Sequence, residues 1–159
     1  MYLWAVSRLK AAGLIQYEVS NFSRKGNESK NNLLVWSGEE YFGFGTGAHS
    51  YFDRTRKGNI RSLKNYISHL KKKTLPIEFE EKLSSNQLAL EFLMLRLRSK
   101  EGVNLKRWVE RFELEWSERE EQYVKFLCDH GHALKKDNHF YLTPKGMLLA
   151  DRITVEMMP

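Results

Sequence analysis

A run of alternating glycines gives this sequence its strongest chemical signal. Gly43, Gly45 and Gly47 are followed by Ala48 and an imidazole, His49. On a strand, a spacing of two residues puts all three bare positions on one face. Glycine on such a face usually marks a close approach to the backbone. The stretch therefore predicts a strand that faces a cofactor, or one that packs closely against another element at a tight turn or bulge.

Two nucleotide-binding motifs come close to this stretch without fitting it. A P-loop needs a Gly-Lys-Ser/Thr sequence at its end, and none follows here. Gly43, Gly45 and Ala48 satisfy a loose G-x-G-x-x-A pattern, but the dinucleotide fingerprint also requires a helix to begin there. The letters HSYFD that follow are typical of a strand or loop. Spacing alone leaves the cofactor-facing strand and the structural strand both open.

The remaining reactive side chains form no recognised constellation. A single histidine such as His49 is more often a hydrogen-bonded structural residue than a ligand or base. Cys128 is the only cysteine, which excludes an internal disulfide and any metal site made of several thiolates within this chain. A lone cysteine also fits a reducing, cytoplasmic location.

The composition is that of a folded protein. Of 159 residues, 42% are hydrophobic and 13% aromatic. No apolar run approaches the roughly 20 residues that a membrane helix needs. The first residues, MYLWAVSRLK, lack the pattern of a secretory signal.

The first half of the chain predicts alternating helices and strands. Residues 2–12 have helical apolar spacing and end at Gly13, a residue typical of a helix C-terminus. Residues 15–19 predict a short strand, residues 41–52 a longer one, and residues 61–73 an amphipathic helix. This order is that of an α/β fold.

A change of character follows Pro76 and the charged EFEEK sequence, which predict a domain boundary. From Ser84 the pattern is nearly all helical, with a capping box at Ser117 and Glu120. A hairpin is predicted at residues 132–142, followed by a helix with Pro144 at its first position. Residues 84–159 therefore predict a small all-α, winged-helix-like domain.

The net charge of +6 is unevenly distributed. Residues 1–83 hold 14 Lys and Arg against 8 Asp and Glu, whereas residues 84–159 hold 12 of each. The helix predicted at 117–129 would be the recognition element of a DNA-reading winged helix, but its net charge is −2. DNA phosphates would repel it. We expect no nucleic-acid binding, although a basic nucleic-acid- or protein-binding module remains the alternative of another class.

Three segments carry a resemblance to a known family. Residues 17–22 read YEVSNF, residues 32–36 read NLLVW, and residues 43–50 read GFGTGAHS. With the helical region, they resemble the C-terminal portion of the HemW-type haem chaperones. These belong to the radical S-adenosylmethionine (SAM) family, which also includes oxygen-independent coproporphyrinogen III oxidase. The resemblance covers essentially the whole chain.

The resemblance implies a fold, a function and cofactors. Residues 1–83 would be the C-terminal part of an incomplete radical SAM α/β barrel, and residues 84–159 a HemW-type helical domain. The parent would handle haem as a chaperone, with coproporphyrinogen III oxidation in porphyrin biosynthesis as the alternative. It would use SAM and a [4Fe–4S] cluster, and its partners would be haem or a porphyrin and a haem-acceptor protein. The residues implied to line the SAM pocket are Gly43, Phe44, Gly45, Gly47 and Ala48.

Two departures from the family pattern limit these expectations. The CxxxCxxC cluster motif is absent, which predicts a fragment without radical activity that binds none of these cofactors tightly alone. The chaperones also carry a His-Asn-x-x-Tyr-Trp motif whose histidine is associated with haem. Asn31, Asn32 and Trp36 stand at its positions here, and a carboxamide is a poor iron ligand. His49 is the candidate substitute.

An incomplete barrel also predicts uneven stability. Loss of neighbouring strands would leave the glycine-rich strand with an open edge and an uncovered face. We therefore expect residues 1–60 to be loosely ordered or self-associating when alone, and residues 84–159 to be stable.

Overall fold

The computed structural model describes residues 1–157, which divide into two compact units. The first, which we call the discontinuous unit, combines residues 1–38 with the described residues from Ala89 onward. The second, which we call the central unit, is Glu39–Leu88. Every strand pairing in the described part of the chain is antiparallel.

The discontinuous unit begins with short elements. Helix α1 (Tyr2–Ala11) ends before Gly13, whose φ of +77° confirms the predicted helix stop. Strand β1 (Ile15–Gln16) pairs with β2 (Phe22–Ser23), so the strand predicted over 15–19 is only two residues long. Helix α2 (Lys30–Trp36) follows, and the side chain of its N-cap residue, Ser29, accepts a hydrogen bond from the Asn32 amide.

The second part of this unit contains the predicted helices and hairpin. The first four residues of helix α4 (Ser85–Leu97) belong to the central unit, and the rest of it opens this part. The elements that follow are β6 (Val103–Asn104), α5 (Leu105–Phe112), α6 (Glu118–Asp129), β7 (Ala133–Lys136), β8 (His139–Leu142), α7 (Pro144–Met147) and α8 (Ala150–Glu156). The capping box at the start of α6 is present, and Pro144 occupies the first turn of α7 as predicted. Strand β6 adds to the hairpin to form a sheet of order β6-β8-β7.

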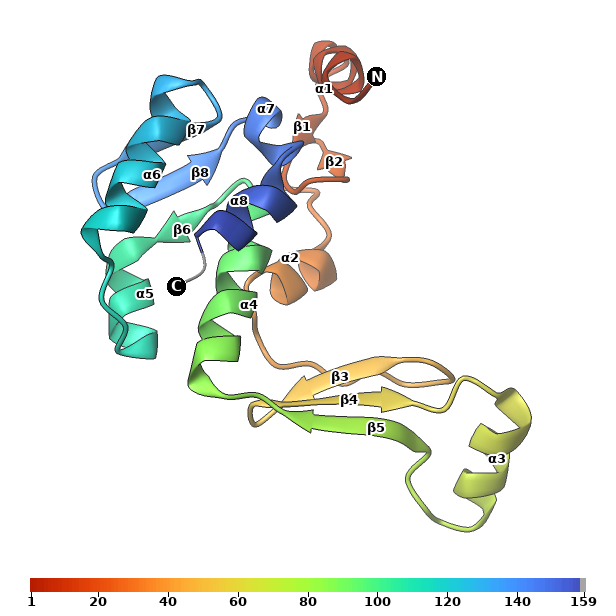
Figure 1. Ribbon diagram of the computed structural model, residues 1–159. Coiled ribbons are helices and arrows are strands. Elements are labelled where there is room, and N and C mark those ends of the chain that lie inside the picture. Colours follow the sequence, from red (N-terminus) through yellow and green to blue (C-terminus); the bar gives the residue numbers. More distant parts are fainter. Residues whose placement is uncertain (158–159) are drawn as a thin grey trace. The chain divides into compact units, whose positions relative to one another are not determined.

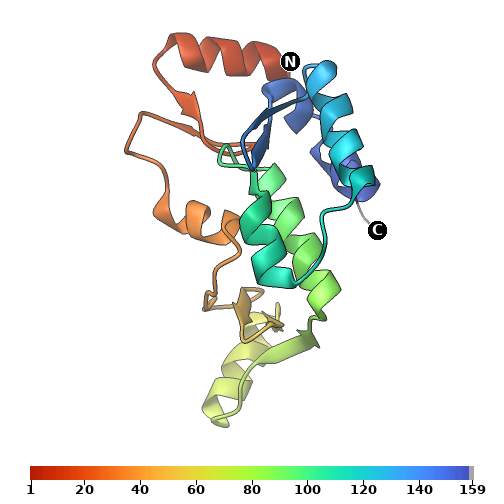
Figure 2. The same cartoon turned by 90° about the vertical axis from the view of Figure 1, so that its left-hand side faces the viewer.

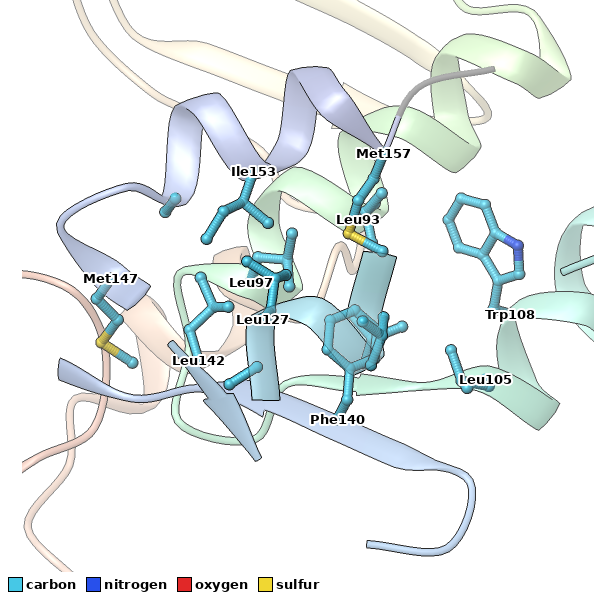
Figure 3. Packing of buried hydrophobic residues seen from close by; sticks show 14 of the residues in the cluster. Leu93, Leu97, Leu105, Trp108, Leu127, Phe140, Leu142, Met147, Ile153 and Met157 are labelled. Atoms are coloured by element: carbon cyan, nitrogen blue, oxygen red, sulfur yellow. The ribbon is translucent and has the colours of Figure 1, made fainter. Parts of the chain in front are cut away.

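A single hydrophobic cluster stabilises this part of the molecule. Phe140 is fully buried, and leucine, isoleucine and methionine side chains from the surrounding helices pack around it (Figure 3). Helices α4 and α5 lie side by side (Figure 2), and the ring of Phe92 contacts those of Trp108 and Phe112. Full burial of one such side chain contributes about 1.5–3 kcal/mol.

Backbone hydrogen bonds join the N-terminal segment to this cluster. The Val19 amide donates to the Arg98 carbonyl at 2.8 Å, and the Lys100 amide donates to the Tyr17 carbonyl at 3.0 Å. Glu18, between them, is only 1% exposed. Residues far apart in sequence therefore form one folded unit.

The central unit is a three-stranded sheet with one helix. Strands β3 (His49–Phe52), β4 (Thr55–Asn59) and β5 (Ile77–Lys82) pair in the order β3-β4-β5. Helix α3 (Leu63–Lys71) lies at the end of the sheet where β4 ends and β5 begins (Figure 1). The amphipathic helix predicted here is confirmed, and the charged residues after Pro76 belong to strand β5.

The strand predicted over residues 41–52 is wrong in its first half. Only His49–Phe52 is a strand, although Tyr41 forms an isolated bridge with Tyr51. Gly45 and Gly47 have φ angles of +102° and +66°, which are incompatible with extended backbone. The bare strand face therefore does not exist, and residues 42–48 form a loop that turns at residues 45–47.

None of the helices within residues 1–157 combines the length and apolar composition needed to span a membrane.

Candidate glycine-loop site

Residues 42–48, which we call the glycine loop, are fixed at both ends by the central sheet. At the start, the Tyr41 and Tyr51 backbones exchange hydrogen bonds of 2.8 and 2.9 Å. At the end, the Asn59 amide donates to the Ala48 carbonyl at 2.9 Å, and the Gly47 amide donates to Ile60 at 3.2 Å. The loop is therefore a connected part of the sheet.

The glycines of this loop serve different geometrical requirements. A β-carbon on Gly43 would lie 2.1 Å from the carbonyl oxygen of His49, so the two backbones approach too closely for a side chain. Gly45 and Gly47 adopt positive φ angles that other residues rarely accept. No atom lies within 4 Å of the β-carbon position of Gly45, so bare backbone borders open space there.

Three polar side chains from outside the loop hold its backbone. Asn59 donates its side-chain amide to the carbonyls of Gly45 at 2.9 Å and Gly43 at 3.4 Å. The Gly45 amide donates to the Tyr66 hydroxyl at 3.2 Å, and the Gly43 amide donates to the Ser50 hydroxyl at 2.9 Å. The backbone amides and carbonyls of Gly43 and Gly45, on either side of Phe44, are therefore all hydrogen-bonded.

This held backbone presents aromatic side chains to solvent. Phe44, between two glycines, is 89% exposed. Phe42 is also exposed, and its ring lies 5.2 Å from that of Phe52. The loop itself contains no ionisable side chain. The loop therefore presents an aromatic face and bare backbone.

His49 begins strand β3 immediately after the loop. Its side chain is exposed, and its ring lies 5.4 Å from that of Phe79. The Phe79 ring covers Gly58, whose hypothetical β-carbon would be only 2.1 Å from it. An accessible imidazole is a common metal ligand.

The asparagines implied by the resemblance lie on α2, in the discontinuous unit. Asn31 is exposed, whereas Asn32 and Trp36 are half-buried. The Asn32 side-chain amide donates to the Tyr17 hydroxyl at 3.5 Å, which links α2 to the YEVSNF segment. The structure thus gathers the five loop residues and His49 in one unit, and Asn31, Asn32 and Trp36 on one helix of the other.

Sequence reasoning missed the residues that hold the loop. Ser50 and Asn59 lie on paired strands, and Tyr66 comes from α3. Their local sequence gives no signal, because each side chain meets the loop only after the sheet and helix have formed. The one available hint was Tyr66 on the apolar face of a helix, where its hydroxyl needs a polar partner.

The residues present do not fit an iron–sulfur cluster. Residues 1–157 contain no group of three or more His, Cys, Asp or Glu side chains able to hold a metal ion. Burial raises the pKa of the Cys128 thiol, and Asp129 raises it further, although Lys135 acts in the opposite direction. The raised pKa favours the protonated thiol over the thiolate, which is the form that binds metals.

A polar hollow of about 530 Å³ lies on the sheet of the discontinuous unit. It is lined in part by Lys100, Lys136, Asn138, His139 and Tyr141. Glu101 and Asp137 also line it, so the hollow carries both positive and negative side chains. None of the residues expected from sequence to bind a cofactor lies there.

Comparison with known proteins identifies relatives of the chain. Residues 83–149 match the HemN C-terminal domain family. The chain is 36% identical over 153 residues to the heme chaperone HemW of Bacillus subtilis, an alignment covering 96% of this chain and 40% of that protein. It is 37% identical over 147 residues to the heme chaperone HemW of Mycobacterium tuberculosis, covering 92% and 36%. The chain spans about two fifths of the length of these relatives.

A solved structure shares the fold. Coproporphyrinogen III oxidase (HemN) from Escherichia coli, described as a radical SAM enzyme, superposes with a TM-score of 0.74 at 14% sequence identity. The match covers 98% of this chain and 39% of that one. At this identity the likeness concerns the fold alone.

Proposed function

We propose, from the chain's membership of the HemW-like group of radical SAM proteins, that it is the C-terminal part of a protein that handles haem. One observation carries the proposal: 36% identity to a heme chaperone over 96% of this chain. The matched segment includes the glycine loop and the helical region. The substrate, cofactors and partners of the complete protein are parts of the same proposal.

The glycine loop is our candidate wall of a SAM site. Open space at Gly45 and the exposed ring of Phe44 support it, because a cofactor can lie against bare backbone and stack on an aromatic face. Gly43, Gly47 and Ala48 complete the set of candidate SAM-site residues. In a radical SAM protein, the cluster supplies the electron that cleaves SAM. Cys128 alone cannot hold such a cluster, so its ligands would come from residues outside this sequence.

His49 is our candidate haem ligand within this chain. Asn31 occupies the position of the family's haem-associated histidine and offers only a carboxamide. The exposed imidazole of His49, with the partly exposed Phe79 ring beside it, provides the two contacts that haem favours. Haem bound there would pass to an acceptor protein, in a cytoplasmic setting that the lone cysteine fits.

Coproporphyrinogen III oxidation is the second candidate function. The specific observation in its favour is Asn31, since a porphyrinogen oxidase does not need to ligate haem iron. The fold of Escherichia coli HemN is compatible with both functions.

The test uses the complete gene product that contains this chain, purified and reconstituted without oxygen. Iron and sulfide are quantified, and haemin is titrated while the Soret band is recorded. Cluster iron with a haemin-induced Soret shift supports the chaperone. Cluster iron without a shift, together with decarboxylation of coproporphyrinogen III, supports the oxidase. Absence of both iron and haemin binding would refute both.

Matched variants locate the haem ligand. His49→Ala should weaken haemin binding by at least tenfold and displace the Soret maximum, because the axial nitrogen is lost. His139→Ala, on the hairpin of the other unit, is the control. Asn31→His should create a second haemin-binding site if α2 retains the family's geometry. An unchanged titration of His49→Ala would exclude His49 as the ligand.

A further inference from the structure

We infer that Asn59 and Tyr66 are positioning residues that fix the glycine loop in its ligand-binding form. The inference rests on the proposed SAM site and adds two residues to it. Neither residue lies within the loop, and the side chain of each forms hydrogen bonds with the loop backbone. Their role would be to hold Phe44 and Gly45 against the adenine-bearing end of the cofactor.

Asn59 is chemically suited to this role. A carboxamide carries two N–H groups, and the Asn59 nitrogen contacts two carbonyl oxygens, those of Gly45 at 2.9 Å and Gly43 at 3.4 Å. The Gly43 carbonyl belongs to the peptide group before Phe44, and the Gly45 carbonyl belongs to the peptide group after Gly45, so one side chain holds the loop backbone on either side of the Phe44–Gly45 pair. An aspartate would place negative charge against two carbonyl oxygens and could not replace it.

Tyr66 completes the clamp from α3. Its hydroxyl accepts the hydrogen bond of the Gly45 amide at 3.2 Å. Gly45 has a φ of +102°, and no atom lies within 4 Å of its β-carbon position. Because Asn59 holds the Gly45 carbonyl and Tyr66 holds its amide, both polar groups of this glycine are engaged. The contact left for a ligand is the exposed ring of Phe44.

This arrangement favours a flat aromatic ligand over a purely polar one. Phe44 is 89% exposed although its neighbouring backbone is fixed, so binding would not require the loop to become ordered. A purine ring stacks on such a face. The adenine of SAM is therefore the ligand group that we assign to Phe44.

The test compares Tyr66→Phe and Asn59→Ala with the unaltered complete protein, loaded with its cluster. Tyr66→Phe removes a single oxygen and keeps the ring, so folding should be preserved. Equilibrium dialysis should show SAM affinity about fivefold weaker in Tyr66→Phe, the effect of one lost hydrogen bond, and a larger loss in Asn59→Ala. Tyr141→Phe, on the hairpin of the other unit, is the matched control. Iron content, melting temperature and haemin affinity should not change in Tyr66→Phe.

A local probe separates positioning from general damage. With 4-fluorophenylalanine at position 44, SAM should shift the ¹⁹F resonance of the unaltered protein. In Tyr66→Phe the resonance should already be broadened without ligand, because the loop samples more conformations. Equal SAM affinity and equal ¹⁹F line widths in both proteins would overturn the inference alone. Absence of SAM binding by the unaltered protein would overturn the proposed SAM site, and the inference with it.

Discussion

At the scale of single residues, the glycines of the glycine loop are needed for two different reasons. Gly43 is needed because the His49 backbone leaves no room for a β-carbon, whereas Gly45 and Gly47 are needed for their φ angles. Phe44 stands among them with its side chain in solvent. Substitutions in neighbouring positions should therefore affect different properties.

Gly43→Ala should destabilise the loop and its sheet. The new methyl group would meet a backbone carbonyl at 2.1 Å, and such overpacking costs about 1–3 kcal/mol. Hydrogen exchange of the amides in residues 41–60 would show the loss as faster opening. Phe44→Ala is the matched control, since its exposed ring should change local stability by less than about 0.5 kcal/mol while SAM binding is lost. Equal exchange in the two variants would contradict the steric account.

Cys128 should react slowly with alkylating reagents. Burial and the neighbouring Asp129 raise the pKa of its thiol, so at pH 8 the thiolate fraction is below that of free cysteine. The rate of iodoacetamide modification should therefore continue to rise above the pH at which free cysteine levels off. Asp129→Asn should lower this pKa and accelerate modification at pH 8. Asp137→Asn, at the hairpin tip, should not, and an equal acceleration there would exclude the Asp129 effect.

At the scale of elements, sequence patterns correctly predicted the helix ends and turns that depend on local propensity and capping. The helix ending before Gly13, the α6 capping box and the hairpin over 132–142 are all present. Strand β5 was missed because its charged, mostly exposed residues disguise a strand whose backbone pairs with β4. The glycines predicted a strand because they recur at every second position, as side chains on one face of a strand do. The positive φ angles of Gly45 and Gly47, which rule a strand out, cannot be read from the sequence.

The same limit applied to the candidate site. The identity of the glycine-loop residues followed from the sequence, whereas the contacts of Asn59 and Tyr66 depend on pairing across the sheet and on the position of α3. Such contacts join residues 14 to 21 positions apart. No local pattern encodes them.

Helix α6 should not bind duplex DNA. Its cations are engaged, since Lys125 pairs with Asp129 at 2.7 Å and Arg119 donates to the Glu156 carbonyl at 3.0 Å. Three glutamates occupy its first turn. Fluorescence anisotropy with a labelled duplex should show no binding at 150 mM salt and only weak binding at 50 mM. Micromolar affinity with a steep salt dependence would revive the nucleic-acid hypothesis.

At the scale of the whole molecule, hydrophobic burial is concentrated in one unit. The core cluster draws all of its fully buried members from residues 89–157. In the central unit, Leu83 and Pro76 are the buried side chains, and the apolar positions Leu63, Ile67 and Leu70 of α3 are exposed. A three-stranded sheet with so little burial has small independent stability.

Hydrogen exchange of the 159-residue chain alone should therefore be uneven. Amides of α4, α6 and β8 should exchange slowly, because they surround the buried Phe140, and amides of β3, β4 and β5 should exchange rapidly. In the complete gene product the three strands should become protected. Equal protection of both units in the isolated chain would contradict this account.

The division of one folded unit between two stretches of sequence also affects the order of events on the ribosome. The Val19 amide and the Tyr17 carbonyl find their hydrogen-bond partners only when Arg98 and Lys100 have been synthesised. At roughly 5–20 residues per second, about 80 intervening residues take on the order of 4–16 s. During that time the Tyr17 carbonyl and the Val19 amide lack these partners, and the Tyr17 and Val19 side chains are available to chaperones. Synthesis rate should therefore influence the yield of this protein more than it would for a domain built from one continuous stretch.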